Sequence, residues 1–228
     1  MPKLKLVFIT FLIALTAIGN CIAETFEDVC RNSLPKAKIT VHTAQSLVKF
    51  DYTKSIRELT RMRNYHKGKV VLGSTYTSIQ MSVKWKFNSL KGQGNRGCTR
   101  ASGDVFMTVN PQTVYIGKEF PFKTCAFNEI YRHEMRHAYT NQEHMERVAD
   151  YYQKLMTEAF GQKIFYGEFN QLQIQLNNEF KTQWMPQITE DLKMVSVLHS
   201  QIDTPEEYAR NEVMCNGIVP EIISEMGF

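Results

Sequence analysis

The pattern of hydrophobic and polar residues changes near residue 122 of the 228-residue chain. Before that point short alternating runs dominate, and the clearest covers 78–87, where every second side chain is apolar. Such alternation predicts a strand with one buried and one solvated face. After that point apolar residues recur every three or four positions, which predicts amphipathic helices.

Shorter elements are expected beside this strand. The expected strands are 39–42, 47–50, 104–109 and 113–116, and the expected helix is 53–63. Asn110-Pro111 is expected to form a turn between the last two strands. The segment 92–97 approximates a phosphate-binding loop, but no helix follows it, so we interpret it as a hairpin connection.

The longest predicted helix covers about 126–160, and its apolar stripe keeps one phase throughout, as on an unbroken helix. The stripe comprises Phe127, Tyr131, Glu134, Ala138, Asn141, Met145, Val148, Tyr152 and Leu155. Glu134 is a polar exception, and a carboxylate in such a stripe needs a compensating partner. Further helices are expected over 165–197, interrupted at Pro186, and from Thr204-Pro205 onward. This order of elements predicts an α+β fold in which a small, mostly antiparallel sheet is followed by a helical half.

Residues 1–23 have the composition of a secretory signal peptide. Lys3 and Lys5 precede an apolar stretch too short for a stable membrane span, and we place cleavage after Ala23. An uncleaved anchor and a lipoprotein modified at Cys21 are the alternatives. Cleavage leaves 24–228 as a single domain that is periplasmic or secreted. It lowers the formal net charge from +4 to +2, and the chain has no basic run with interleaved aromatics, so we expect no nucleic-acid partner.

The mature chain keeps four cysteines, and an even number in an exported protein predicts two disulfides. Three pairings exist, and we favour Cys98–Cys125 with Cys30–Cys215. A zinc site built from these cysteines is disfavoured because no two of them form a C-x-x-C pair.

The predicted long helix contains the sequence His133-Glu134-Met135-Arg136-His137, an H-E-x-x-H motif. Residues four apart share one helix face, so the two imidazoles can hold one Zn²⁺ as cofactor. Glu134 is then placed to take a proton from a zinc-bound water. The motif therefore predicts His133 and His137 as metal ligands and Glu134 as the catalytic residue. The competing interpretation is a solvated helix with two surface histidines.

A catalytic zinc site needs a third protein ligand, and four candidates stay open: His144, His199, Glu206 and Glu207. On an unbroken helix His144 lies about 10 Å along the axis from His137, too far to share one ion. Glu206 and Glu207 lie in the first turn of the last predicted helix, where a glutamate also stabilises the helix dipole.

The runs 114–120 and 128–137, Cys125 between them, and Val83-Lys84-Trp85 resemble a group of bacterial exported proteins that are predicted zinc-dependent proteases. The resemblance covers about 37–160. It implies His133 and His137 as zinc ligands and Glu134 as the catalytic acid and base, and it implies no substrate. Zincins place a sheet edge above the active-site helix, and by that analogy we expect the strand 113–116 to be this edge.

We therefore expect an exported zinc metallopeptidase that hydrolyses peptide bonds in a peptide or protein substrate. One alternative is a non-enzymatic exported binding protein whose metal is structural or absent. Another is a peptidase that acts on cell-wall peptides.

Overall fold

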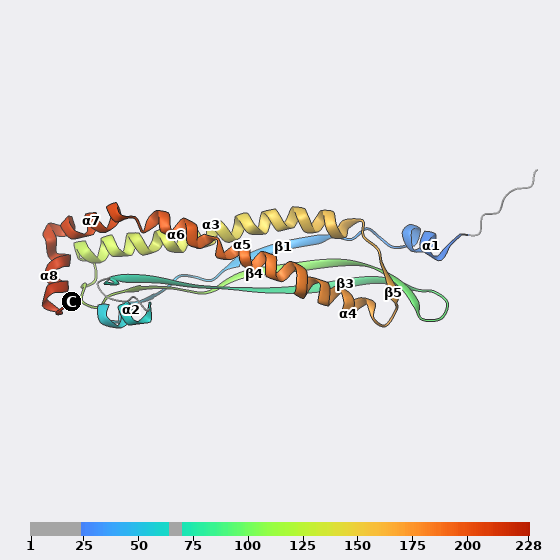
Figure 1. Cartoon of the computed structure of the whole chain (residues 1–228), viewed down its shortest axis with the longest axis horizontal. Helices are drawn as coiled ribbons and strands as arrows, with labels where there is room; N and C mark the ends of the chain where they lie inside the picture. The colour runs from blue at the N-terminus through green and yellow to red at the C-terminus, as the bar shows by residue number, and fades with distance from the viewer. Residues whose placement is uncertain (1–23, 64–69) are drawn as a thin grey trace, which may run out of the picture.

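The structure is a computed structural model that describes residues 24–63 and 70–228, so the predicted signal peptide lies outside the described residues. The elements form an elongated molecule with α1 at one end and the C-terminal helices at the other (Figure 1). The elements are α1 Phe26–Ser33, β1 Ile39–Gln45, β2 Lys49–Asp51, α2 Ile56–Met62, β3 Gly73–Lys91, β4 Arg96–Ile116, α3 Cys125–Gly161, β5 Phe165–Glu168, α4 Leu172–Glu179, the π-helical turn η1 Phe180–Trp184, α5 Met185–Lys193, α6 Val195–Ile202, α7 Pro205–Val213, the 3₁₀ turn η2 Met214–Gly217 and α8 Ile218–Glu225.

The sheet is organised around β4, a strand of 21 residues. One edge of β4 pairs antiparallel with β3, and the other edge pairs in turn with β5, β1 and β2. Both β1 and β2 run parallel to β4. The expectation of a small, mostly antiparallel sheet is therefore wrong: the sheet is mixed, and its two longest strands have 19 and 21 residues. Alternation in the sequence indicates which face of a strand is buried, but it does not indicate whether the neighbouring strand runs parallel or antiparallel.

The expected turn at Asn110-Pro111 is also wrong, because β4 runs through it as one strand. Both residues lie opposite an irregularity in β3, where the register shifts between Thr77 and Ile79. On the other edge of β4, β1 ends opposite Val109 and β2 begins opposite Thr113. Pairing is therefore interrupted on both edges of β4 at this point. Pro111 can be accommodated there because it has no N–H to donate to a neighbouring strand. The hairpin connection expected over 92–97 is confirmed, since it joins β3 to β4.

Helix α3 lies along the sheet (Figure 1). The apolar stripe predicted from the sequence lies on its buried side. It is unbroken over 37 residues and begins where Thr124 Oγ1 accepts from the N–H of Phe127 at 3.3 Å. Midway along α3, Met145 and Tyr152 pack on Met107 of β4 and on α5. Toward its C-terminus, Phe160 packs on the sheet and on η1. Apolar burial therefore fixes α3 against β4 along most of its length.

The C-terminal half departs from the sequence expectation in two respects, a strand at its start and no interruption at Pro186, and follows it in a third. The region 165–197 begins with β5, and α4, η1 and α5 form a continuous helical run through Pro186, which occupies the first turn of α5. Thr204 caps α7 as expected, because its Oγ1 accepts from the N–H of Glu207 at 3.2 Å. Helices α6, α7 and α8 gather with α2 at one end of the molecule (Figure 1).

Two disulfides are present, which confirms the expected number, but the favoured pairing is wrong. Cys30 bonds Cys98, and Cys125 bonds Cys215. The first joins α1 to the start of β4, and the second joins the start of α3 to the turn before α8. Disulfides are typical of proteins outside the cytoplasm. Over residues 24–63 and 70–228, none of the helices combines the length and apolar character needed to cross a bilayer.

Gly73 sets how closely the start of β3 approaches α3. A Cβ atom at this position would lie 2.7 Å from Ile130 Cγ2 and 2.8 Å from Glu134 Cγ. We expect Gly73→Ala to lower the free energy of unfolding by about 1–3 kcal/mol, as overpacking does, in urea denaturation. Gly161→Ala is the matched control, since nothing lies within 4 Å of that Cβ position. Equal stability of the two variants would contradict the close approach.

Candidate metal centre

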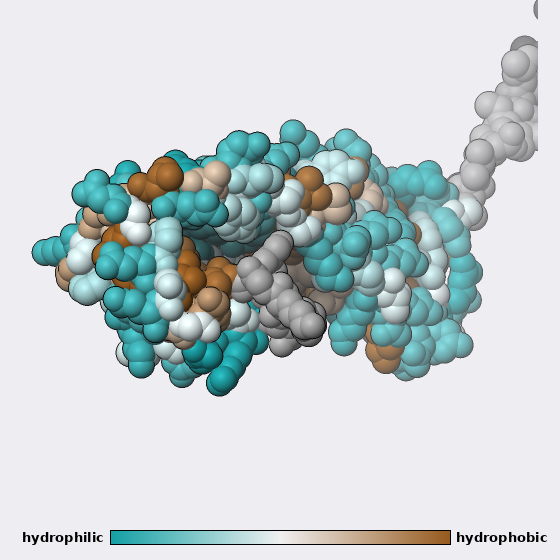
Figure 2. Space-filling model, turned by 60° about the vertical axis from the view of Figure 1, so that its left-hand side comes forward, coloured by the Kyte–Doolittle hydropathy of each residue, from teal (hydrophilic) through white to brown (hydrophobic). Residues whose placement is uncertain are grey.

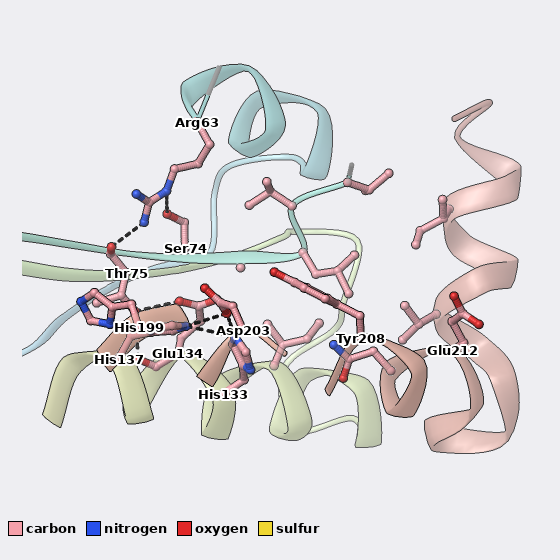
Figure 3. Close-up of a pocket in the computed structure, with 18 of the residues that line it drawn as sticks. Arg63, Ser74, Thr75, His133, Glu134, His137, His199, Asp203, Tyr208 and Glu212 are labelled. Atoms are coloured by element: carbon pink, nitrogen blue, oxygen red, sulfur yellow. Dashed lines mark hydrogen bonds and ion pairs between the residues drawn. The ribbon is translucent and has the colours of Figure 1, made fainter. Parts of the chain in front are cut away.

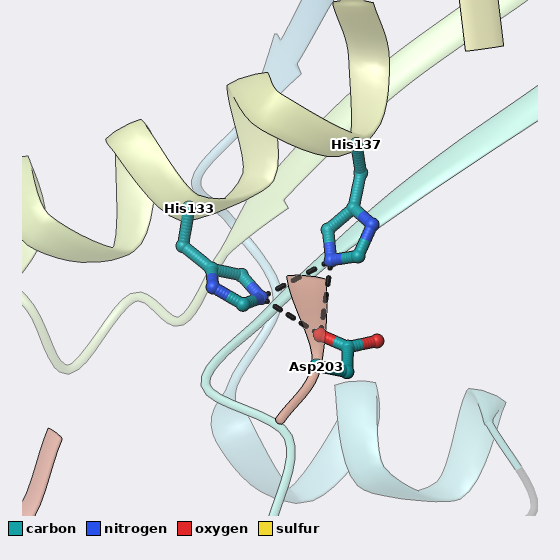
Figure 4. Close-up of side chains that lie close together, drawn as sticks. All are labelled: His133, His137 and Asp203. Carbon is teal, nitrogen blue, oxygen red and sulfur yellow. Dashed lines mark hydrogen bonds and ion pairs between the residues drawn. The ribbon is translucent and has the colours of Figure 1, made fainter. Parts of the chain in front are cut away.

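Three side chains from two segments of the chain converge at one point. His133 and His137 project from one face of α3 toward Asp203, which directly follows α6 (Figure 4). The Nε2 atoms of His133 and His137 lie 3.0 and 3.1 Å from Asp203 Oδ1, and 3.1 Å from each other. Ligands at zinc-like bond lengths in a tetrahedral site are about 3.3 Å apart, so the triangle needs little adjustment to hold an ion. The three residues could therefore hold a metal ion.

The electrostatics of this triangle favour a positive charge at its centre. Burial alone lowers the pKa of His133, but hydrogen bonds to Asp203 and Glu207 outweigh it and raise the pKa above its ordinary value. Burial raises the pKa of Asp203, and the hydrogen bonds from His133 and His137 outweigh it and hold that pKa well below its usual range. A proton shared among these side chains supplies one positive charge at this point, and a divalent cation would supply two.

The second nitrogen of His133 is held by Glu207 of α7. Nδ1 of His133 lies 3.1 Å from Glu207 Oε1. Nη2 of Arg136 also lies 3.1 Å from Nδ1. A carboxylate only accepts hydrogen bonds, so when Nε2 binds an ion, Nδ1 would carry the proton and donate it to Glu207. Glu207 also pairs with Arg136 and Arg210. Burial raises the pKa of Glu207, but the hydrogen bonds from Arg210 and His133 outweigh it and lower the pKa to about 2.

The second nitrogen of His137 is held by another histidine. Nδ1 of His137 lies 2.9 Å from Nδ1 of His199, and Nε2 of His199 lies 3.0 Å from Asn141 Oδ1. Asn141 Nδ2 donates to Thr77 Oγ1 at 3.0 Å, which leaves its Oδ1 to accept from His199. His199 then accepts from Nδ1–H of His137, so Nε2 of His137 can give its lone pair to an ion in place of its hydrogen bond to Asp203. Burial, followed by the nearby His137, lowers the pKa of His199 to about 4, which keeps this ring neutral.

Glu134 is buried between α3 and the start of β3. Only 5% of its surface is exposed, and Thr75 Oγ1 donates to its Oε2 at 2.8 Å. Burial raises the pKa of Glu134 above its ordinary value, and the hydrogen bond from Thr75 opposes that rise. Thr75 and Gly73 therefore supply the partner and the space that a carboxylate in the apolar stripe requires.

These residues open onto a pocket of about 1190 Å³ (Figure 3). Its walls come from the start of β3, from α3, from α6 and α7, and from α8. His133, Glu134, His137 and Asp203 all line it, so a bound ion and the carboxylate of Glu134 would face the same space. A concave site with a few convergent polar groups is the usual form of a ligand or substrate site.

None of the four residues considered as the third ligand belongs to the group formed by His133, His137 and Asp203. Nε2 of His144 donates to the carbonyl oxygen of Asp191 at 2.8 Å, away from the site. His199 and Glu207 contact the ligand histidines instead of completing the triangle, and Glu206 is exposed. Asp203 was missed. One signal could have found it: His199, Asp203 and Glu207 are spaced by four, as are His133, His137 and Asn141.

If Asp203 is a ligand, Asp203→Ala should weaken metal binding by more than the 10–100-fold typical of residues that only support a ligand. Isothermal titration of metal-free protein with Zn²⁺ measures this change. Asp150→Ala, an exposed acid on α3, is the control and should bind as the wild type does. Unchanged affinity in Asp203→Ala would remove Asp203 from the site.

His199→Ala should weaken Zn²⁺ binding by about 10–100-fold, because Nδ1–H of His137 loses its acceptor. His199→Gln, which restores an acceptor oxygen, should recover part of the affinity. His144→Ala removes a histidine whose ring donates to the carbonyl oxygen of Asp191, away from the site, and should leave affinity unchanged. Competition with a fluorescent chelator gives the affinities, and equal values for both alanine variants would contradict the relay through His199.

Comparisons with protein-family models, with curated proteins and with solved structures give no match for this chain. The resemblance to exported zinc-dependent proteases therefore stays an expectation from the residues around the motif. What the protein does must be argued from its site alone.

Proposed function

We propose that this protein is an exported zinc metallopeptidase, periplasmic or secreted, in which His133, His137 and Asp203 hold Zn²⁺. The observation that carries the proposal is that three ligand atoms within 3.1 Å of one another lie beside a buried glutamate in one pocket. Two imidazoles and one carboxylate also suit ferrous iron. We favour zinc because Zn²⁺ is redox-inert, whereas ferrous iron can be oxidised in the oxidising compartment that the disulfides indicate.

The number of ligands favours a catalytic over a structural ion. Structural zinc sites are closed by four protein ligands, whereas catalytic sites have three and an open position. Within the described part of the chain, three donors converge, and the pocket adjoins them. A bound Zn²⁺ supplies Lewis acidity, which activates water and polarises a carbonyl group.

Glu134 is the residue that moves the proton in this proposal. Its carboxylate lines the same pocket as the ligands, and Thr75 fixes its orientation. It accepts a proton from the attacking water and delivers it to the amine that leaves. Burial raises the pKa of Glu134 above its ordinary value, which makes the carboxylate a stronger base for that proton.

A peptide is favoured as the substrate because an edge strand borders the pocket. Among the described residues β3 pairs only with β4, and its residues 73–77 line the pocket. An extended peptide can add to such an edge through main-chain hydrogen bonds. The edge is not the strand 113–116, as the sequence suggested, because that segment lies inside β4 with partners on both sides.

The proposal predicts that Glu134→Gln binds one Zn²⁺ per chain and loses about 10²–10⁴-fold in kcat on a cleaved peptide. Glutamine keeps the size of the side chain and cannot take the proton. Elemental analysis of the purified variant measures the metal, and Glu143→Gln, an exposed position on α3, is the control. Full activity of Glu134→Gln would end the assignment of Glu134.

Chelation separates the peptidase from the alternative of a non-enzymatic binding protein. A catalytic ion can be removed with loss of turnover while the circular dichroism of the fold is retained. Purified protein without metal, or loss of the fold together with the metal, favours the binding protein. Digestion of purified peptidoglycan, compared with digestion of denatured protein, tests whether cell-wall peptides are the substrate.

A further inference from the structure

The pocket that holds the candidate metal centre has two ends of different chemistry. At one end, toward the C-terminal half of α3, it is lined by polar groups that include Arg63, Thr77, Asn141 and His199. At the other end its walls come from the start of β3, from α3 and from α8. We call the apolar lining of this end the apolar chamber, which consists of Val70, Leu72, Ile130, Val219, Ile223 and Phe228. The polar side chains of Asn211, Glu212 and Ser224, from α7 and α8, also line the pocket.

The apolar chamber is a fixed part of the fold. Val70, Leu72 and Ile223 pack against a core cluster that contains Ile130 and Val219, whose exposed fractions are only 4% and 2%. The C-terminal end of the chamber is held by α2, because Arg57 Nη2 donates to the carbonyl oxygen of Met226 at 2.7 Å. The Arg57 guanidinium also lies 5.0 Å from the ring centre of Phe228. Hydrophobic side chains gather in a hollow at this end of the molecule (Figure 2).

Glu134 adjoins the apolar chamber. Ile130 lies one helical turn before Glu134, and both side chains lie against Gly73, within 3 Å of where its Cβ would be. Tyr208 of α7 extends into the pocket between Asp203 and α8, and its ring marks the boundary of the metal centre (Figure 3). The polar end lies on the other side of the ligands, beyond His137 along α3.

The position of Glu134 assigns the chamber to one side of the bond that is cut. The group that protonates the leaving amine must lie within hydrogen-bond reach of that amine. The residue that contributes the amine therefore lies on the Glu134 side of the metal ligands, next to Ile130 and Leu72. An apolar wall there stabilises a large apolar side chain and rejects a charged one, which would lose its hydration.

We propose, on the basis of the peptidase function above, that the apolar chamber selects peptides with a large apolar residue immediately after the scissile bond. The pocket volume of about 1190 Å³ holds such a side chain together with the neighbouring residues of an extended peptide. The substrate class is then a peptide or unfolded segment with leucine-like or phenylalanine-like side chains.

The test uses zinc-loaded protein and a set of otherwise polar decapeptides whose single central Leu is replaced by Phe, Ala, Asp or Lys. We expect cleavage directly before Leu or Phe, identified by mass spectrometry, with kcat/KM at least about tenfold above the Ala peptide. The Asp and Lys peptides should not be cut at that position. Cleavage without this preference, or with the apolar residue before the scissile bond, overturns the inference and leaves the peptidase proposal standing.

A variant that fills the chamber provides a second test. Ile223→Phe adds volume inside the chamber and should reduce the ratio of kcat/KM for the Phe peptide over the Ala peptide by about tenfold. Ile218→Phe makes the same change on α8 outside the pocket and should keep the wild-type ratio. Thermal unfolding of both variants checks their fold. An unchanged ratio in folded Ile223→Phe contradicts the chamber as the selecting surface.

Peptide binding to Glu134→Gln gives a measurement that does not need turnover. Fluorescence anisotropy should show at least tenfold tighter binding of the Phe peptide than of the Asp peptide. If wild-type protein cuts none of the peptides but this preference in binding holds, the chamber is supported and the peptidase proposal fails. If neither cleavage nor a preference in binding is found, both proposals fail.

Discussion

The antiparallel packing of α3 against the α6–α7 segment is the constraint on which the candidate site depends. The disulfide Cys125–Cys215 fixes the register of the two segments. His133 lies eight residues after Cys125 and contacts Glu207, which lies eight residues before Cys215. His137 and Asp203, which contact each other, are each twelve residues from the disulfide, and Asn141 and His199 are each sixteen. These three polar pairs therefore follow from one register, with both partners spaced by four along their segments.

A second constraint is the approach of β3 to α3, which positions Glu134. The ladder between β3 and β4 holds the start of β3 opposite Ile116, and the apolar packing of α3 on β4 fixes the distance between helix and sheet. Only glycine fits at position 73 within that distance. Thr75, two residues further along β3, then reaches the carboxylate of Glu134. The sheet thus places Glu134, the proposed acid and base, and the C-terminal helices place Asp203, the proposed third ligand.

Local patterns in the sequence predicted what depends on local structure. The structure contains the predicted helix around the motif, the strand around 78–87 and the Thr204 cap. These features depend on residues that are close together in the sequence. The direction of β1 and β2 and the disulfide pairing were predicted wrongly, and the convergence of Asp203 with His133 and His137 was not predicted, because each depends on which distant segments meet. Asp203 shows this difference most clearly. Its sequence neighbours indicate only an acidic residue at the end of a helix, and it lies beside His133 and His137 because of how its segment packs against α3.

The helices α6 and α7, on either side of Asp203, bury little of their own surface, so a bound metal would have a structural consequence as well as the proposed chemical one. Neither α6 nor α7 contains a fully buried residue, so apolar packing contributes little to holding them on α3. Their attachment depends on the disulfide at one end and on polar contacts of His199, Asp203 and Glu207 along the segment. An ion bound between both segments adds its binding free energy to that attachment, since it binds only when Asp203 is docked. Binding of an ion would therefore also stabilise the pocket wall formed by α7, because Asp203 and Tyr208 belong to the same short stretch of chain.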